Sequence, residues 1–336
     1  MSNPSKPGLL LIPHLQVQNA NAISSPMTWG FPSMTAFIGL MHALERKLGP
    51  DSGLEFFGVG VVCHRFQAQT HQNYIHSFCL SRNPVLKNGS TAAITEEGRI
   101  HLDISLVFEV SISGNSLDTD KATLQQYADT VAHTLAGMRI AGGSVIAAHQ
   151  PLSRRALQPH LQFLAQDDED TAGQYQQFAQ LSQRLLPGFA LVSRDDVLQA
   201  HLAALRAGDS DPASVTALDA WLDLSRINYR AVQQTTEGTE TTVWQRDERT
   251  GWLVPISVGY VALSALHPAG TVTQARDDHT PLRFVEAVYS MGQWISPRRL
   301  KNIHQIFWHP GHDPETGLYR CVNDYITPPD ADQPSL

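Results

Sequence analysis

Apolar positions in the N-terminal half of the chain alternate between the spacing of strands and the spacing of helices. An apolar run over residues 8–17 predicts a buried strand that opens into a polar loop. Over residues 34–48 apolar side chains recur three and four positions apart, and Gly49-Pro50 follows, which predicts a helix that ends there. Residues 54–66 and 100–112 are rich in apolar side chains, so both predict strands.

A second helical pattern begins after Asp118 or Asp120 and ends near Gly137, and a strand is expected over residues 144–148. The order strand, helix, strand, strand, helix, strand is that of a split βαβ unit. We therefore predict an α+β fold with an RRM-like, ferredoxin-like βαββαβ core over residues 8–150.

The middle of the chain has a different pattern, which predicts a mostly helical insertion over residues 151–242. Its last part, residues 233–242, is rich in Thr, Gln and Glu and predicts an exposed loop. The helices are expected over residues 175–186, 195–205 and 213–224.

The C-terminal part returns to strand character over residues 252–266. We predict that residues 243–327 form a strand and helix segment that packs back on the first domain and completes the core. The tail, residues 328–336, is expected to fray.

Composition and charge exclude several classes of protein. The chain has 336 residues, of which 42% are hydrophobic and 17% charged, so it is neither disordered nor a small disulfide-stapled protein. The net charge of -8 excludes a uniformly basic coat for nucleic acid but leaves room for a local basic groove. Arg outnumbers Lys by 19 to 5, which suits phosphate contacts, and a genomic bias toward Arg codons explains the ratio as well.

Cysteine usage and hydropathy indicate the compartment. Cys63, Cys79 and Cys321 cannot all pair and have no zinc-ribbon spacing, which fits a reducing cytoplasm. No signal-peptide core is present near the N-terminus. The uncharged stretch over residues 250–275 is interrupted by prolines and glycine, so no membrane helix is expected.

Common catalytic motifs, such as those of zinc proteases, P-loop enzymes and serine hydrolases, are absent. His304, His309, His312 and Asp313 are close enough in sequence to suggest a metal site. However, Pro310 and its neighbours are expected to break this segment into turns, which favours loop histidines without metal. A metal-dependent nuclease that uses these histidines is the minority hypothesis, and a protein-only scaffold is another.

Two features indicate a nucleic-acid partner. The glycine-rich stretch over residues 135–144 contains Arg139, Gly142 and Gly143, and it lets a phosphate backbone approach main-chain N–H groups. A plain helix stop explains these glycines equally well. Basic residues also gather at two other places. The first is Arg154-Arg155, and the second contains Arg298, Arg299 and Lys301. Aromatic residues flank the second place, namely Trp294, Phe307 and Trp308.

Positive groups interleaved with aromatics are able to track a single strand and stack its bases, whereas each basic pair alone fits an ordinary solvated surface. We expect the flanking aromatic residues to form an exposed patch that a large partner covers. The aromatic RNP1 signature of a standard RRM is missing, so bases are not expected to stack across the sheet in the usual way.

Several short stretches, in this order and spacing, carry a resemblance to a known family. They are Leu11-Ile12-Pro13, Gln18-Asn19-Ala20-Asn21-Ala22, Thr28-Trp29-Gly30-Phe31-Pro32, Phe37-Ile38-Gly39-Leu40-Met41-His42-Ala43-Leu44, Arg139-Ile140-Ala141-Gly142-Gly143, Gly251-Trp252-Leu253-Val254-Pro255, Val258-Gly259-Tyr260, Arg283-Phe284-Val285-Glu286 and Trp294-Ile295-Ser296-Pro297-Arg298-Arg299-Leu300. Together they resemble the Cas-five-like (second Csy) subunit of type I-F CRISPR surveillance complexes.

The resemblance implies a non-catalytic subunit, without cofactor or metal, that holds the 5′ handle of the crRNA. It implies three further partners: the large Csy subunit as a heterodimer, a Cas-seven-like backbone subunit, and target DNA through the assembled complex. Cutting of precursor RNA belongs to a separate Cas-six-like endonuclease. For RNA contacts we expect amide side chains to meet bases and basic groups to meet phosphates. These residues are Gln18, Asn19, Asn21, Arg139, Gly142, Gly143, Arg154, Arg155, Arg298, Arg299 and Lys301. The alternative for Gln18, Asn19 and Asn21 is that they only cap turns.

Overall fold

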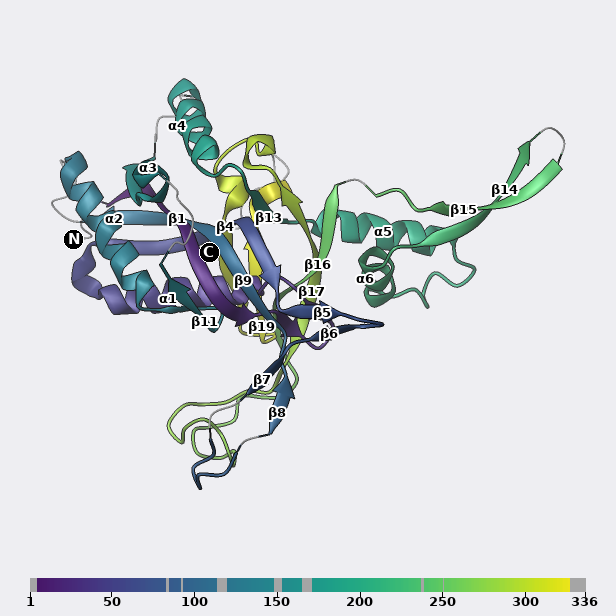
Figure 1. The fold of residues 1–336 in the computed structure, drawn as a ribbon, viewed down its shortest axis with the longest axis horizontal. Helices are drawn as coiled ribbons and strands as arrows, with labels where there is room; N and C mark the ends of the chain where they lie inside the picture. Colours follow the sequence, from purple (N-terminus) through teal and green to yellow (C-terminus); the bar gives the residue numbers. More distant parts are fainter. Residues whose placement is uncertain are drawn as a thin grey trace.

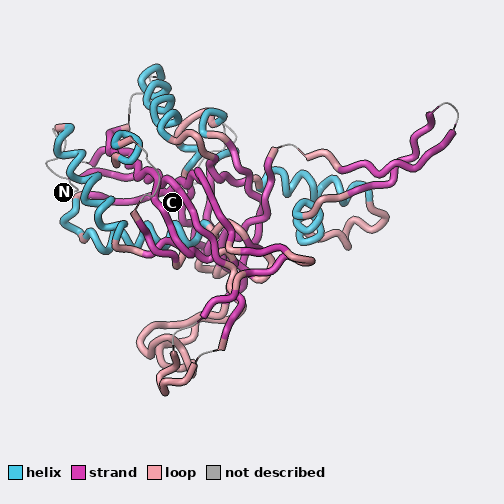
Figure 2. The backbone as a smooth tube through the Cα atoms, viewed as in Figure 1, coloured by secondary structure: helices cyan, strands magenta, loops and turns pink. Residues whose placement is uncertain are grey.

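The computed structural model describes residues 5–82, 85–91, 93–113, 120–147, 153–164, 171–236, 239–249 and 251–326. An antiparallel sheet of 11 strands dominates these residues, so the predicted α+β class is confirmed (Figures 1 and 2). Neighbouring strands follow the order β10-β11-β1-β9-β4-β13-β17-β16-β19-β18, and β12 also pairs with β1.

Three long strands form the centre of the sheet, and they are β1 (Ser5–Asn21), β9 (Arg99–Ser113) and β4 (Leu54–Ala68). The apolar runs of β1 and β4 are nearly continuous because both faces of the sheet are buried there, whereas apolar and polar residues mostly alternate in β9. Leu10 packs in the larger hydrophobic core, together with the buried residues of α1 (Met34–Leu48) and α2 (Lys121–Ala136). Its neighbours Leu9 and Leu11 belong to a second core, which includes Leu181 from α4 (Thr171–Arg184).

The ends of the two N-terminal helices follow from local chemistry, and both predicted helices are confirmed. The Ser33 side chain accepts a hydrogen bond from the Thr35 N–H at 3.3 Å and begins α1. The Asp120 carboxylate accepts from the Thr123 N–H at 2.8 Å and begins α2. Gly49, with a φ of 80°, ends α1 where the sequence predicts.

The other half of the sheet comes from the C-terminal part of the chain and from one strand of the middle part. Its strands are β13 (Phe189–Ser193), β17 (Val285–Ile295), β16 (Trp252–Ala262), β19 (Leu318–Asn323) and β18 (Trp308–Asp313). Strand β18 pairs with β4 through Trp308 and Val59, while β13 pairs with β4 through Phe189 and Ala190. Strand β4 therefore pairs with the first and the last of these five strands, so the six strands form a closed ring.

Two sequence predictions are wrong in this half. The predicted loop over residues 233–242 belongs to a hairpin of β14 (Tyr229–Thr236) and β15 (Thr239–Arg246), because its β-branched Thr and Val residues pair across the two strands. The hairpin projects far from the body of the molecule (Figure 1). The predicted turns around Pro310 are strand β18, in which Pro310 lies opposite Cys321. Strand β18 pairs with β4 only through Trp308. Pro310, which has no N–H, therefore breaks no hydrogen bond between β18 and β4.

Further short elements connect these parts. Helices α5 (Asp195–Gly208) and α6 (Ala217–Ser225) lie at the base of the projecting hairpin (Figure 1). The others are β2 (Ile23–Ser25), β3 (Thr28–Trp29), β5 (Thr70–Gln72), β6 (His76–Phe78), β7 (Leu80–Arg82), β8 (Ile94–Glu96), β10 (Arg139–Ile140), β11 (Gly143–Ile146), α3 (Arg154–Leu157) and β12 (His160–Phe163), with 3-10 turns η1 (Pro50–Ser52), η3 (Pro297–Arg299), η4 (His304–Ile306) and η5 (Asp324–Ile326). Within the described residues, no helix has the length and apolar character needed to cross a membrane.

Candidate nucleic-acid interface

The glycine-rich stretch forms a tight hairpin between β10 and β11. Ala141 and Gly142 make the turn, with φ angles of 47° and 79°, so both occupy the left-handed region that two-residue hairpin turns require. Gly143 is needed for a different reason, because the backbone of β1 lies close to its Cα. A Cβ on Gly143 would lie 2.7 Å from the Ala20 amide nitrogen and 2.8 Å from the Gln18 carbonyl oxygen. The helix before it ends at Gly137, so the glycines at 142 and 143 are not part of the helix stop.

A depression of about 410 Å³ brings three of the predicted RNA-binding residues together, and these are Asn21, Arg139 and Gly142. Arg139 is exposed and donates a hydrogen bond to the Gly142 carbonyl oxygen at 3.0 Å, which fixes one edge of its guanidinium beside the turn. No carboxylate is among the described residues that line this depression. The Arg139 charge is therefore not neutralised within it.

The first turn of α1 faces the same depression through Ser33, Thr35 and Ala36. This turn contains no acidic residue, and a helix N-terminus carries a partial positive charge. Arg139 and the helix end thus supply positive potential from two elements that are far apart in sequence. Such an arrangement favours an anion such as a phosphate.

The predicted amide residues lie next to this hairpin. Gln18 is exposed and pairs with Ser144 of β11. Asn19 is also exposed, and its φ of 57° marks a bulge where β1 shifts register against β9. The Asn21 side chain both accepts from and donates to the backbone of Ile23, at 3.2 and 2.7 Å, so it caps a turn as the alternative interpretation holds.

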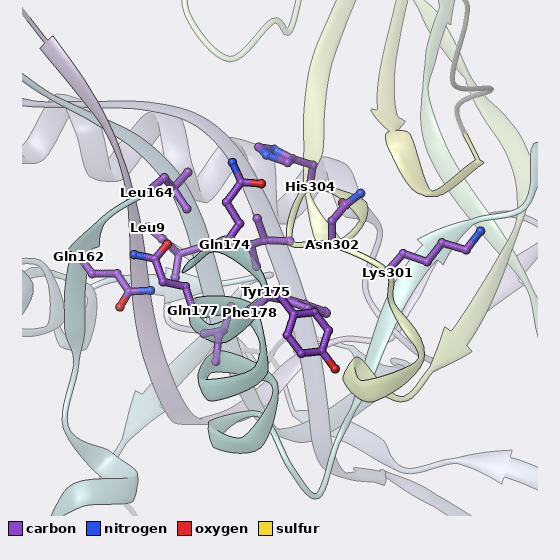
Figure 3. Close-up of a pocket in the computed structure, with 12 residues that line it drawn as sticks. Leu9, Gln162, Leu164, Gln174, Tyr175, Gln177, Phe178, Lys301, Asn302 and His304 are labelled. Atoms are coloured by element: carbon purple, nitrogen blue, oxygen red, sulfur yellow. The ribbon is translucent and has the colours of Figure 1, made fainter. Parts of the chain in front are cut away.

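The second group of predicted basic residues lies elsewhere. Arg298 and Arg299 are exposed on η3, which contacts α4, and they are absent from the lining of the Arg139 depression. Lys301 is among the lining residues of a smaller pocket of about 220 Å³ against α4, and its side chain extends away from Tyr175 and His304 (Figure 3). Arg154 and Arg155 begin the short helix α3, and their side chains lie outside the described part of the structure.

The predicted aromatic patch beside these basic residues is wrong. Phe307 and Trp308 are both 0% exposed, and the Trp308 indole donates to the Leu191 carbonyl oxygen at 2.9 Å. Trp294 is partly buried and packs edge-on against Phe31. Trp308 is buried because β18 pairs with β4 as well as with β19, and Phe307 packs in the second core. Neither side chain is therefore accessible for a base to stack on.

Sequence reasoning missed a larger aromatic cavity of about 470 Å³. It is lined by segments that the resemblance had already singled out, around Trp29, Phe31, Trp252 and Trp294, and residues of β4 and Phe189 of β13 complete it. Ser24, Pro32 and Ser33 line both this cavity and the Arg139 depression, so the two hollows adjoin. The signal in the sequence was a Trp in each of three separate stretches that carry the resemblance, namely Trp29, Trp252 and Trp294.

Two of the C-terminal histidines, His304 and His309, lie near the same carboxylate, that of Glu109. His309 lies 2.7 Å from a Glu109 oxygen, and His304 lies 3.9 Å from the other oxygen of the same carboxylate. The hydrogen bond to Glu109 raises the pKa of His309 above its usual value of 6.5, against the opposing effect of burial. His312 is on the same strand, next to Asp313, whose carboxylate accepts from the Thr316 hydroxyl at 2.6 Å.

A different set of residues has the spacing of a metal site among those that the structure describes, and it consists of His14, His64 and Asp103. The His14 and Asp103 side chains are 3.0 Å apart, and the His14 and His64 rings stack at 4.1 Å. His64 uses both ring nitrogens for hydrogen bonds at 2.6 Å, to the Pro187 carbonyl oxygen and the Ser105 hydroxyl. Burial lowers the pKa of His64, so its neutral form is favoured. The Ser105 hydroxyl links the His14 backbone to the His64 ring, and His64 is the residue of this set that also lines the aromatic cavity.

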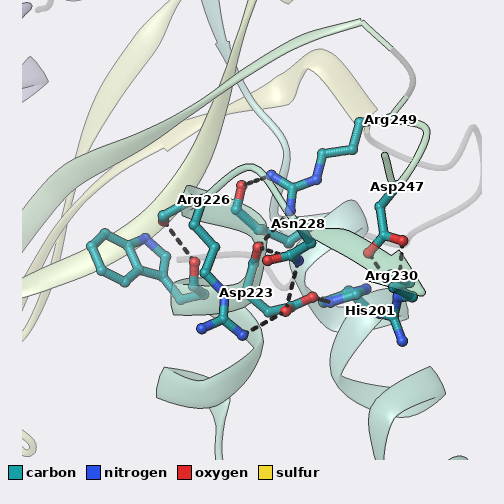
Figure 4. Close-up of polar contacts among 10 residues, drawn as sticks. His201, Asp223, Arg226, Asn228, Arg230, Asp247 and Arg249 are labelled. Atoms are coloured by element: carbon teal, nitrogen blue, oxygen red, sulfur yellow. Dashed lines mark hydrogen bonds and ion pairs between the residues drawn. The ribbon is translucent and has the colours of Figure 1, made fainter. Parts of the chain in front are cut away.

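The base of the projecting hairpin is held by a polar network on α6 (Figure 4). Asp223 accepts hydrogen bonds from His201 and Asn228 at 2.8 Å each. Arg249 donates to the carbonyl oxygen of Asp223 near the C-terminal end of α6, where free carbonyl groups attract cations. Arg230 and Asp247 pair across the two strands that leave the base, at 2.8 Å. These contacts fix the direction in which the hairpin leaves α6.

Comparison with known proteins agrees with the resemblance. A family model described as CRISPR-associated protein (Cas_Csy2) matches residues 10–321. A relative named CRISPR-associated protein Csy2, from Pseudomonas aeruginosa, is 44% identical over 326 residues, which cover 95% of this chain and 96% of the relative. Both matches extend over nearly the whole chain, including the middle part in which the quoted motifs are sparse.

Proposed function

The chain belongs to the CRISPR-associated Csy2 family of type I-F Csy complexes, and from this premise we propose that it is the subunit that holds the 5′ handle of the crRNA. The observation that carries the proposal is the meeting of Asn21, Arg139 and Gly142 at the N-terminal end of α1. An exposed Arg, a helix N-terminus and a glycine turn together form a phosphate site for a single strand.

The strand order supports an RRM-like core as part of this proposal. Strands β11, β1, β9 and β4 are neighbours in that order, α1 connects β1 to β4, and α2 lies between β9 and β11. Both helices contribute to the same core. On the other face, Leu9, Leu11 and Val107 are buried in the second core, so that face is not open to stacked bases. This burial supports a binding site for RNA at the edge of the sheet, at the β10–β11 hairpin.

We also propose that the chain does not cut RNA and works only within the assembled complex, in the cytoplasm. Its partners would be the large Csy subunit, a Cas-seven-like backbone subunit and, through the guide, target DNA. The support for a non-catalytic role is that His309 is hydrogen-bonded to Glu109, and that the C-terminal histidines are not in the group with metal-site spacing among the described residues. The test is incubation of the pure protein with repeat RNA and with DNA, in Mg²⁺, Mn²⁺ or Zn²⁺. Cleavage that disappears in a His309→Ala, His312→Ala double variant would establish the nuclease hypothesis instead.

Handle binding is tested by a salt series with the chain in its heterodimer with the large subunit. If Arg139 meets one phosphate, Arg139→Ala should reduce the slope of log K against log salt by about 0.7 and weaken cognate and scrambled handles alike. Arg46→Ala is the matched control, because Arg46 is an exposed Arg in the last turn of the same helix α1. Equal slopes for wild type, Arg139→Ala and Arg46→Ala would contradict the proposal.

The same assay decides the role of the second basic group. A parallel loss of slope in an Arg298→Ala, Arg299→Ala variant would extend the RNA path to η3. An unchanged slope would remove these two residues from the interface, while leaving the Arg139 site in place. A base-reading role for Asn19 predicts that Asn19→Ala loses affinity for the cognate handle alone, with the slope unchanged.

A further inference from the structure

We propose that the aromatic cavity receives an apolar side chain, flanked by an acidic residue, from a neighbouring protein subunit. The cavity lies between the segment around Trp29 and strands β4, β13, β16 and β17. This inference rests only on membership in a complex of several subunits, and it holds whether or not the Arg139 depression binds RNA.

Exposed aromatic side chains surround the cavity. Trp29 is 59% exposed, Phe66 57%, Trp252 50% and Phe189 45%. Phe189 and Trp252 contact each other edge-on, with ring centroids 5.8 Å apart. Aromatic residues around a hollow, accompanied by an Arg, are typical of the central part of a protein–protein interface. A contiguous apolar surface of this kind is costly in water and marks a site that a partner covers.

The hydrogen-bonding groups in the cavity select an apolar occupant. The Ser24 and Thr28 hydroxyls bond to each other at 2.9 Å, and the Ser33 hydroxyl donates to the Ser257 carbonyl oxygen at 2.9 Å. His64 directs both ring nitrogens to groups that do not line the cavity. A nucleobase buried here would bring donors and acceptors that these groups do not match, at a cost in desolvation. A Leu, Met or Phe side chain has no polar group to desolvate, and a Trp side chain has only its indole N–H.

Charge at the rim adds a second requirement. No carboxylate lines the cavity among the described residues, and Arg65 is exposed at its edge. Burial lowers the pKa of His64, so the imidazole beside Arg65 adds no positive charge near neutral pH. If a base of an RNA strand entered the cavity, the two phosphates that flank its nucleotide would both lie near a single positive charge, that of Arg65. A single acidic residue next to an apolar anchor matches Arg65 directly.

The direct test replaces Phe66 by a photoreactive benzoylphenylalanine in the assembled complex, followed by irradiation and mass spectrometry. Phe66 is at the rim and 57% exposed, so the replacement does not disturb the core. We expect an adduct with a peptide of a protein subunit that carries a large apolar residue next to Asp or Glu. An adduct with the guide RNA, or no adduct in a complex that assembles normally, would overturn the proposal.

Variants provide a second measurement, the dissociation constant of the heterodimer with the large subunit. Ala68→Trp fills the cavity without removing a native side chain, and Arg65→Glu reverses the charge at the rim. Each should weaken the heterodimer by about tenfold or more, as substitutions at interface hot spots do. Trp244→Ala and Arg46→Glu are the matched exposed controls, and neither residue lines the cavity.

Circular dichroism melting curves identify any variant that fails to fold. Folded Ala68→Trp and Arg65→Glu proteins that bind the large subunit as tightly as wild type would refute the proposal. Loss of handle RNA binding in these variants, with the protein contact intact, would refute it as well and assign the cavity to a base. The Arg139 salt series is unaffected by either outcome, so failure here is distinguishable from failure of the proposed RNA site.

Discussion

Two adjacent glycines at the β10–β11 turn should respond very differently to the same added methyl group. A Cβ on Gly143 would lie within 2.8 Å of three atoms, and two of these belong to the backbone of β1. Backbone atoms cannot rotate away, so β1 and β11 must separate along their paired residues. On Gly142 a Cβ meets nothing within 4 Å, and the cost is confined to the left-handed φ of 79°.

These contacts set the expected magnitudes. For Gly143→Ala, overpacking costs about 2 kcal/mol, and one weakened ladder hydrogen bond adds about 1 kcal/mol. The sum of about 3 kcal/mol corresponds to a fall in Tm of about 4 °C for a chain of 336 residues. For Gly142→Ala, a non-glycine residue in the left-handed region costs about 1 kcal/mol, so the fall in Tm should be about 1 °C.

The assay is thermal unfolding of wild type and both variants, followed by circular dichroism. Gly142→Asn should recover most of the loss at that position, because Asn tolerates the left-handed region. Handle binding should fall further in Gly143→Ala than in Gly142→Ala, since Arg139 is paired with Ser144 on the displaced strand. Equal destabilisation by the two alanines, or a larger effect at Gly142, would refute the reasoning about close approach.

Two further predictions concern neighbouring residues of β18. In a urea titration, Trp308→Phe should lower the free energy of unfolding by about 2 kcal/mol, because it leaves the Leu191 carbonyl oxygen without its indole donor. The exposed control Trp244→Phe should change the free energy of unfolding by less than about 0.5 kcal/mol. His309 should stabilise the fold mainly at low pH. Its folded pKa is raised above 6.5, so its contribution is fully present below that pH and is lost as the pH rises through the folded value. The difference in urea midpoint between wild type and His309→Gln should therefore shrink between about pH 6 and pH 8, and a difference that grows would contradict the assigned pair with Glu109.

The sequence pattern was sufficient to predict the elements that depend on neighbouring residues in the chain. The stripe that begins at Met34 and the caps at Ser33 and Asp120 gave both N-terminal helices, and alternating apolar residues gave β9. Hairpin β14–β15 differs from the prediction because its polar composition favours a loop. Its Thr and Val residues are β formers whose partners lie across the hairpin, which composition alone does not reveal.

The candidate site was predictable only in part, for a similar reason. Arg139 and its glycines were found because the turn chemistry is local. Their meeting with the first turn of α1 depends on how the strands are ordered, and no short pattern encodes that order. The burial of Trp308 likewise depends on a bridge to Val59, which is distant in sequence. The aromatic cavity required segments around Trp29, Trp252 and Trp294 to converge.

The proposed handle site is tested most directly by crosslinking within the assembled complex. Handle RNA that carries 4-thiouridine is incorporated and irradiated, and the crosslinked peptides of this chain are identified by mass spectrometry. The account predicts crosslinks in peptides that contain Asn21 and residues 139–143, with loss of the second set in Gly143→Ala. Crosslinks confined to the peptide of Arg298 and Lys301, or none to this chain, would contradict the account.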